Sequence, residues 1–113
     1  MKNRAEELGL GERVGWLGEI AQEDLPALYS GAMLFVFPSE YEGFGLPVLE
    51  AMACGVPVVC SNTSGLKEIA EDAAVLFDPR DSNEIAQAIL KVLGTEGTRK
   101  ELVELGLARA GNY

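Results

Sequence analysis

Apolar and polar residues alternate along the chain in short blocks of strand and helix length. Continuous, largely apolar runs of strand length predict four buried strands, at residues 14–17, 33–37, 56–60 and 74–77. The segments between and after them carry helical spacing or helix start and stop signals, which predicts helices at residues 1–8, 23–31, 47–53, 66–71, 83–93 and 96–110. Alternating strands and helices with short connections predict an α/β fold. We expect a three-layer, Rossmann-like parallel sheet of about four strands with helices on both faces.

Local signals refine several of these elements. Pro47 suits the first position of its helix, and Gly55 is expected to end that helix. Ser82 is expected to cap helix 83–93. The run 33–37 is apolar throughout, so we expect a strand that is buried on both faces. The last helix, 96–110, is expected to pack on the outside.

Composition and charge limit the number of domains and the partners. With 113 residues the chain is expected to form a single domain, 1–113. Its net charge of −9 argues against nucleic acid or an anionic membrane as the partner of this surface. Between Arg13 and Lys67 there is no Lys or Arg. An anion bound by that stretch must therefore be held by backbone N–H groups.

The histidine and cysteine counts exclude several kinds of metal site and catalytic site. The chain has no His and two Cys, so neither an ordinary zinc site nor a His-assisted nucleophile can be assembled from it. We expect no metal site. Cys54 and Cys60 have apolar neighbours and are expected to be small buried hydrophobes, with a disulfide as the minor alternative. This favours a reducing, cytoplasmic location.

The loop between the second predicted strand and helix 47–53 has the composition of a ligand loop. Gly43 and Gly45 allow the backbone to approach a ligand closely. The N–H groups of Phe44, Gly45 and Leu46 come just before a helix N-terminus, where an anion is stabilised without a lysine. The alternative is a turn in which the glycines serve geometry alone.

Two carboxylates accompany this loop. Glu42 precedes the glycines, and Glu50 lies one turn into the helix. A carboxylate does not suit a phosphate, but it can accept two hydrogen bonds from a vicinal diol. Diols together with phosphate describe a sugar nucleotide. The alternative is that Glu50 only complements the helix dipole and Glu42 is solvated.

The segment from Glu42 to Glu50 resembles the E-x7-E motif of retaining glycosyltransferases with the GT-B fold, of the glycosyltransferase family 4 type. Further blocks that resemble this family occur in its order, at residues 14–18, 28–32, 37–39, 50–59, 65–68 and 76–79. The resemblance implies that residues 1–113 form most of the C-terminal, donor-binding half. It also implies transfer of a hexosyl group from a nucleoside-diphosphate sugar to a glycan, lipid or small-molecule acceptor, with no cofactor.

The same resemblance assigns roles to individual residues. Glu42 would be catalytic, beside the transferred sugar and the reacting carbon, and Glu50 would hold the ribose hydroxyls. The remaining donor-binding residues would contact the diphosphate, the sugar or the nucleobase: Gly18, Ile20, Gly43, Phe44, Gly45 and Leu46. Ser64 and Gly65 would sit close by, and Glu68 is expected to be structural.

Departures from the family pattern set limits on this interpretation. The family's C-terminal half begins with a further strand and with an Arg and a Lys that clamp the diphosphate, and none of these is present. The N-terminal acceptor domain is also absent, so we expect these residues alone to be inactive. The alternative is an excised subdomain or scaffold that folds without binding donor. An exposed sheet edge would favour a homodimer, and the full-length enzyme could be cytoplasmic or peripheral to a membrane.

Overall fold

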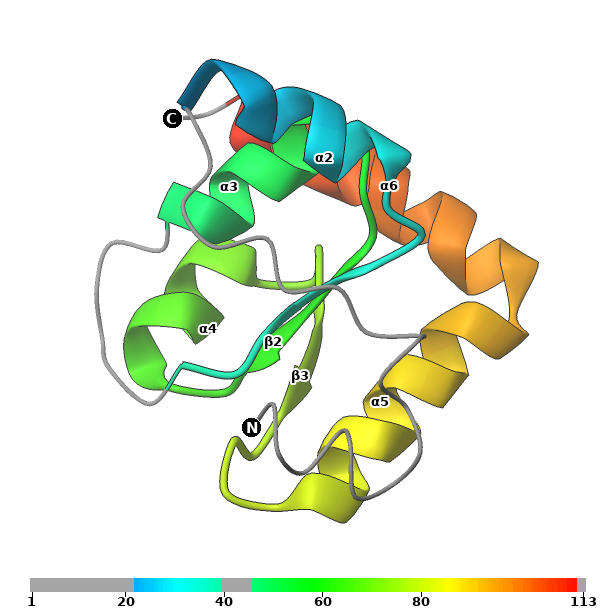
Figure 1. Ribbon diagram of the computed structural model, residues 1–113. Helices are drawn as coiled ribbons and strands as arrows, with labels where there is room; N and C mark the ends of the chain where they lie inside the picture. The colour runs from blue at the N-terminus through cyan, green and yellow to red at the C-terminus, as the bar shows by residue number, and fades with distance from the viewer. Residues whose placement is uncertain (1–21, 40–45, 112–113) are drawn as a thin grey trace, which may run out of the picture.

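The computed structural model describes residues 22–39 and 46–111 (Figure 1). The predicted helix at 1–8 and the predicted strand at 14–17 lie outside these residues. The elements in chain order are η1 (Gln22–Asp24), α2 (Leu25–Gly31), β1 (Phe35–Phe37), α3 (Leu46–Ala53), β2 (Val58–Ser61), α4 (Ser64–Ala70), β3 (Val75–Phe77), α5 (Ser82–Gly94) and α6 (Glu96–Ala110). No helix in the described ranges is long and apolar enough to cross a membrane.

The described strands form a parallel sheet in the order β1-β2-β3. Helices cover both of its faces, which confirms the predicted α/β class and three-layer arrangement. Three of the predicted strands are present, each shifted or shortened by one or two residues. The predicted full burial of the 33–37 run is wrong, because β1 is only half-buried. Within the described residues β1 has a neighbouring strand on one side only, whereas β2, between two strands, is buried along its whole length.

Side chains of the strands alternate between two cores, as the pleat requires. Phe35, Phe37 and Cys60 face the core built with α3 and α4. Val59 and Phe77 face the other core, which α5 completes. Figure 1 shows α3 and α4 on one side of the sheet and α5 on the other.

Helix α3 ends where the sequence predicts. Gly55 has a φ of 75°, in the left-handed region that glycine adopts without strain. Its N–H donates to Met52 O at 3.1 Å, and the N–H of Val56 donates to Ala51 O at 3.1 Å. These two bonds make a Schellman motif, which fixes the end of α3 and the direction of the chain into β2.

The start of α5 corrects one prediction. Asp81, not Ser82, is the N-cap: its Oδ1 accepts the N–H groups of Asn83 at 3.0 Å and Glu84 at 3.2 Å. The preceding turn is closed by the Asp81 N–H, which donates to Asp78 O at 3.1 Å. The turn therefore brings the chain into the helix one residue earlier than expected, and Ser82 becomes its first residue.

Helix α6 has the predicted bounds, but one face of it is buried. It packs along α3, where Gly106 lies against Met52, and it contributes Leu102 to the core beneath α5. Near its end, Arg109 donates to Ile69 O at 2.6 Å and to Glu68 O at 2.9 Å. A guanidinium at the last carbonyls of α4 stabilises that helix end, so α6 joins the two connecting helices of the sheet. The predicted homodimer is not tested by a single chain and stays a prediction.

Candidate functional site

The carboxyl ends of the strands lie side by side at one edge of the sheet. Ser61 Oγ, which is buried, donates to Phe37 O at 3.2 Å and joins the ends of β2 and β1. The N–H of Asn62 donates to Phe77 O at 2.8 Å and joins the ends of β2 and β3. In open parallel sheets this is the edge where ligands bind, because the loops leading into helices gather there.

A pocket opens at this edge beyond β2 and β3. It has a volume of about 460 Å³, and its described lining is Asn62, Thr63, Pro79 and Arg80. Thr63 precedes α4 as its N-cap, but its side chain makes no capping bond. Its Oγ1 atom is buried and has no hydrogen-bond partner among the described residues. A buried hydroxyl without a partner is unusual in a folded protein, so Thr63 is a notable polar group beside this pocket.

Glu50 lies one turn into α3 and lines a second pocket. This pocket has a volume of about 400 Å³ and lies between α2 and α3. Its described lining is Leu25, Pro26, Tyr29, Glu50, Ala53 and Cys54. Glu50 is half-buried and is the acidic residue among these lining side chains. Tyr29 lines the same pocket and faces it from α2.

Tyr29 is held in place by aromatic neighbours. Its ring meets the ring of Phe35 edge to face, with centroids 5.4 Å apart and planes at 88°. The Phe35 ring stacks in turn on Phe37, with centroids 5.9 Å apart. Burial raises the pKa of Tyr29, and the nearby Glu50 and Cys54 raise it further. At neutral pH the Tyr29 hydroxyl therefore stays protonated.

The predicted site residues are only partly within the described structure. Leu46 is the first residue of α3 and is 55% exposed. Its N–H has no partner within the helix, because a helix leaves its first N–H groups unbonded. Six predicted site residues lie outside the described residues: Gly18, Ile20, Glu42, Gly43, Phe44 and Gly45. The pairing of Glu42 with Glu50 at one rim therefore stays a prediction.

Two residues of this region were not singled out from the sequence. Tyr29 falls within the predicted helix 23–31, and Thr63 falls between the predicted strand 56–60 and the predicted helix 66–71. The available signal for Tyr29 was its hydroxyl, since a tyrosine whose ring is buried usually needs a hydrogen-bond partner. For Thr63 no comparable signal exists in the sequence, because its burial depends on how the loop folds back.

The cysteines differ from each other more than the sequence suggests. Both are free thiols; Cys60 is buried as predicted, whereas Cys54 is only half-buried and lines the Glu50 pocket. Burial raises the pKa of Cys60 to about 12. Within 22–39 and 46–111, no group of three His, Cys, Asp or Glu side chains could hold a metal ion.

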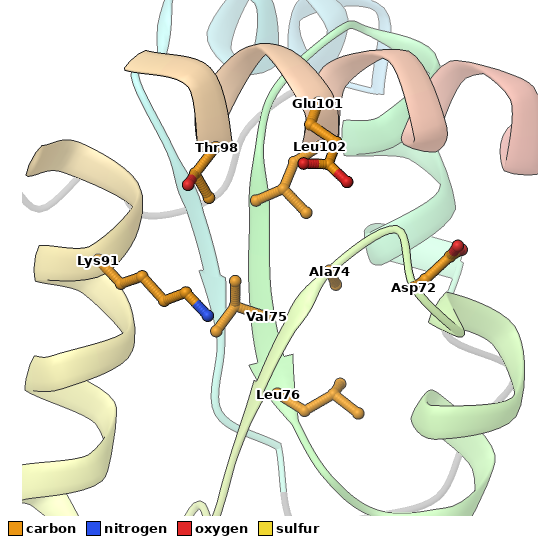
Figure 2. Close-up of a pocket in the computed structure, with 8 residues that line it drawn as sticks. All are labelled: Asp72, Ala74, Val75, Leu76, Lys91, Thr98, Glu101 and Leu102. Atoms are coloured by element: carbon orange, nitrogen blue, oxygen red, sulfur yellow. The ribbon is translucent and has the colours of Figure 1, made fainter. Parts of the chain in front are cut away.

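A further hollow, of about 500 Å³, lies beside β3 (Figure 2). Lys91 from α5 and Thr98 from α6 are on one side of it, and Asp72 and Glu101 are on the other, across an apolar floor that includes Val75. It flanks the beginning of β3 rather than the carboxyl ends of the strands. Its position and mixed charge do not match the ligand edge described above.

Comparisons with known proteins agree with the fold. The sequence matches the family described as glycosyl transferases group 1 over residues 1–108. It is 50% identical, over 91% of this chain, to the O-antigen chain mannosyltransferase B of Escherichia coli, of which it spans 28%. The sucrose-phosphate synthase of Thermosynechococcus elongatus superposes on 97% of the chain with a TM-score of 0.89 and 38% identity, and the chain covers 28% of that structure.

A second solved structure is that of Anabaena HepE in complex with UDP and glucose. It matches 97% of this chain with a TM-score of 0.88 and 30% identity, and the chain covers 30% of it. The chain thus spans less than a third of these relatives and carries the GT-B, Rossmann-like fold that they share. By sequence and by fold, the chain belongs to the glycosyl transferases group 1 family.

Proposed function

We propose that this chain is the donor-binding part of a retaining glycosyltransferase. It would bind a nucleoside-diphosphate sugar at the carboxyl ends of β1 and β2, and the hexosyl group would pass to a glycan, lipid or small-molecule acceptor held by a separate N-terminal domain. Residues 1–113 would form most of the C-terminal half of that enzyme. The similarity to HepE, whose structure contains UDP and glucose, supports this class of ligand.

The observation that carries the proposal is the position of Glu50. Glu50 is half-buried, lies one turn from the start of α3 and lines the pocket between α2 and α3. An ionised carboxylate has two oxygens and about four acceptor sites, so it can accept hydrogen bonds from a vicinal diol such as the 2′- and 3′-hydroxyls of ribose.

The backbone would hold the charged part of the donor. The N–H of Leu46 at the start of α3, with those of Phe44 and Gly45, would contact the diphosphate. Such fixed donors stabilise the negative charge that develops on the leaving phosphate. Glu42 would stabilise the positive charge at the anomeric carbon, and Gly18 and Ile20 would line the nucleobase. The proposal invokes no metal ion or other cofactor.

Nucleotide titration tests the proposal. UDP, GDP and ADP would be titrated against the chain by isothermal calorimetry and ligand-observed NMR. The nucleotide that binds should lose affinity in Glu50→Ala. Hydrogen bonds to a charged group contribute about 1.5–3 kcal/mol each, so the dissociation constant should rise about tenfold or more. Glu104→Ala is the matched control, because Glu104 is exposed on α6 and lines none of the pockets described above.

The outcomes separate the proposal from its alternative. Equal binding by the wild type and Glu50→Ala would remove Glu50 from the site. No binding of any of the three nucleotides at millimolar concentration would favour a subdomain that folds without holding donor. The absence of Lys and Arg between Arg13 and Lys67 favours that alternative, because no side-chain cation from this stretch could hold the diphosphate.

A cytoplasmic location is the companion proposal. Cys54 and Cys60 are both free thiols, which suits a reducing compartment. The net charge of −9 also remains a reason to expect that nucleic acid is not a partner.

A further inference from the structure

We propose that Arg109 is a conformational latch. It holds the turn between α4 and β3 in a strained backbone conformation, and the turn relaxes when the end of α6 moves away from it. The inference goes beyond the proposed function and does not depend on it. It concerns residues 68–73 and the last turn of α6, which are not among the described lining of the Glu50 pocket or of the pocket beyond β2 and β3.

The turn places a glutamate where glycine is favoured. Glu71, the residue directly after α4, has a φ of 48° and a ψ of −117°. The N–H of Ala73 donates to Ala70 O at 2.8 Å and closes a four-residue turn in which Glu71 is second and Asp72 is third. These angles are those of the first central residue of a type II′ turn, a position dominated by glycine. A side chain with a Cβ atom is strained in this conformation, which persists only where surrounding contacts enforce it.

Arg109 supplies such contacts from α6. Its Nε donates to Ile69 O at 2.6 Å, and its Nη2 donates to Glu68 O at 2.9 Å. The same Nη2 lies 3.2 Å from Glu71 Oε1. The side chain of Glu71 is 60% exposed, so this ion pair alone contributes little. The Arg109 side chain is only 20% exposed, and its two bonds from a charged donor to carbonyl oxygens are the stronger part of the latch.

The latch joins two elements that also meet at the hollow beside β3. The strained turn supplies Asp72, and α6 supplies Glu101, about two turns before Arg109. Figure 2 shows both carboxylates on the same side of the hollow, opposite Lys91. Because Arg109 joins the turn to α6, it fixes how these two walls of the hollow lie. Relaxation of the turn would therefore change the shape of the hollow.

Amide hydrogen exchange of Ala73 tests the latch, because this N–H closes the turn. Arg109→Met removes every donor of the side chain and keeps a good helix former. The Ala73 N–H should then exchange about tenfold faster or more, as expected for the loss of hydrogen bonds from a charged group. Arg99→Met is the matched control, since Arg99 also lies on α6 and donates to another helix, at Leu93 O and 3.0 Å. It should leave the exchange of Ala73 as in the wild type.

The strain is tested separately at residue 71. Glu71→Gly and Glu71→Ala both remove the carboxylate, but only alanine keeps a Cβ atom. The Ala73 N–H should exchange about fivefold more slowly in Glu71→Gly than in Glu71→Ala, because glycine adopts a positive φ without strain. Combined with Arg109→Met, Glu71→Gly should return the exchange of Ala73 toward the wild-type rate, and Glu71→Ala should not. Equal rates in the glycine and alanine variants would overturn the inference.

A second amide separates a latch from a general effect on stability. The N–H of Asn62 donates to Phe77 O at 2.8 Å, within the sheet. Its exchange should be unchanged in Arg109→Met. An equal rise at Asn62 and Ala73, or no rise at Ala73, would overturn the inference. Circular dichroism checks the fold; if Arg109→Met does not fold, Arg109→Lys keeps the charge without the planar fork, and the same two outcomes at Ala73 and Asn62 decide.

Discussion

The contact between α3 and α6 can be tested with one added methyl group. Gly106 is a buried residue of α6. A Cβ atom at this position would lie 3.1 Å from Met52 Cγ and 3.3 Å from Met52 Cβ. Both distances are shorter than an ordinary carbon–carbon contact of about 3.5–4.0 Å. Met52 is 1% exposed, so it has no open space to move into, and Gly106→Ala should force the two helices apart.

Two opposing effects decide the sign of the change in stability. Replacing glycine by alanine within a helix stabilises it by about 1 kcal/mol. Overpacking a filled core costs about 1–3 kcal/mol. The Cγ of Met52 could shift with its side chain, but its Cβ is fixed to the α3 backbone, so the upper half of that range is the better guide. We expect Gly106→Ala to lower the free energy of unfolding by about 1–2 kcal/mol, because the cost of overpacking exceeds the helical gain.

Urea unfolding followed by circular dichroism measures this free energy, and Gly97→Ala is the matched control. Gly97 is in the same helix, and a Cβ there meets no atom within 4 Å. It should therefore show the helical gain alone, up to about 1 kcal/mol. The two variants should move the midpoint in opposite directions with equal slopes. If Gly106→Ala proves as stable as Gly97→Ala, α6 does not pack on Met52 as described, and the α3–α6 contact must be looser.

Two further predictions concern the start of α5 and the thiols. Asp81→Ala should lower the free energy of unfolding by about 1 kcal/mol, because two N–H groups lose their acceptor; Ser82→Ala should change it by a few tenths at most, and equal effects in urea unfolding would contradict the assignment of the cap. With iodoacetamide at pH 8, Cys54 should be alkylated in the folded protein. Cys60, buried and with its pKa raised to about 12, should react only after unfolding, and mass spectrometry of peptides that shows both labelled at similar rates would refute this.

Much of the described fold could be predicted because its signals are local. The β-branched run around Val58 marks a strand whatever surrounds it, and Gly55 ends α3 through a backbone conformation that other residues rarely adopt. The errors arise where a structural feature depends on residues far away in the sequence or on several contacts acting together. The half-burial of β1 depends on which strands flank it, and the cap of α5 depends on a turn that closes one residue early through Asp78.

In the candidate site too, residues with local signals could be predicted and residues placed by helix packing could not. Glu50 was predicted because its position one turn into a helix follows from the spacing of Pro47 and Gly55. The pocket that Glu50 shares with Tyr29 was not predicted, because helical periodicity does not specify how α2 and α3 cross. Yet the pattern held more information than a list of apolar positions. A tyrosine within an apolar stripe buries its ring and leaves a hydroxyl that must be paired. The polar residues able to pair it lie on the element that the stripe packs against. Every charged residue between 14 and 66 is acidic, so a charged acceptor for such a hydroxyl within this stretch is a carboxylate, and which carboxylate it is depends on how the helices pack.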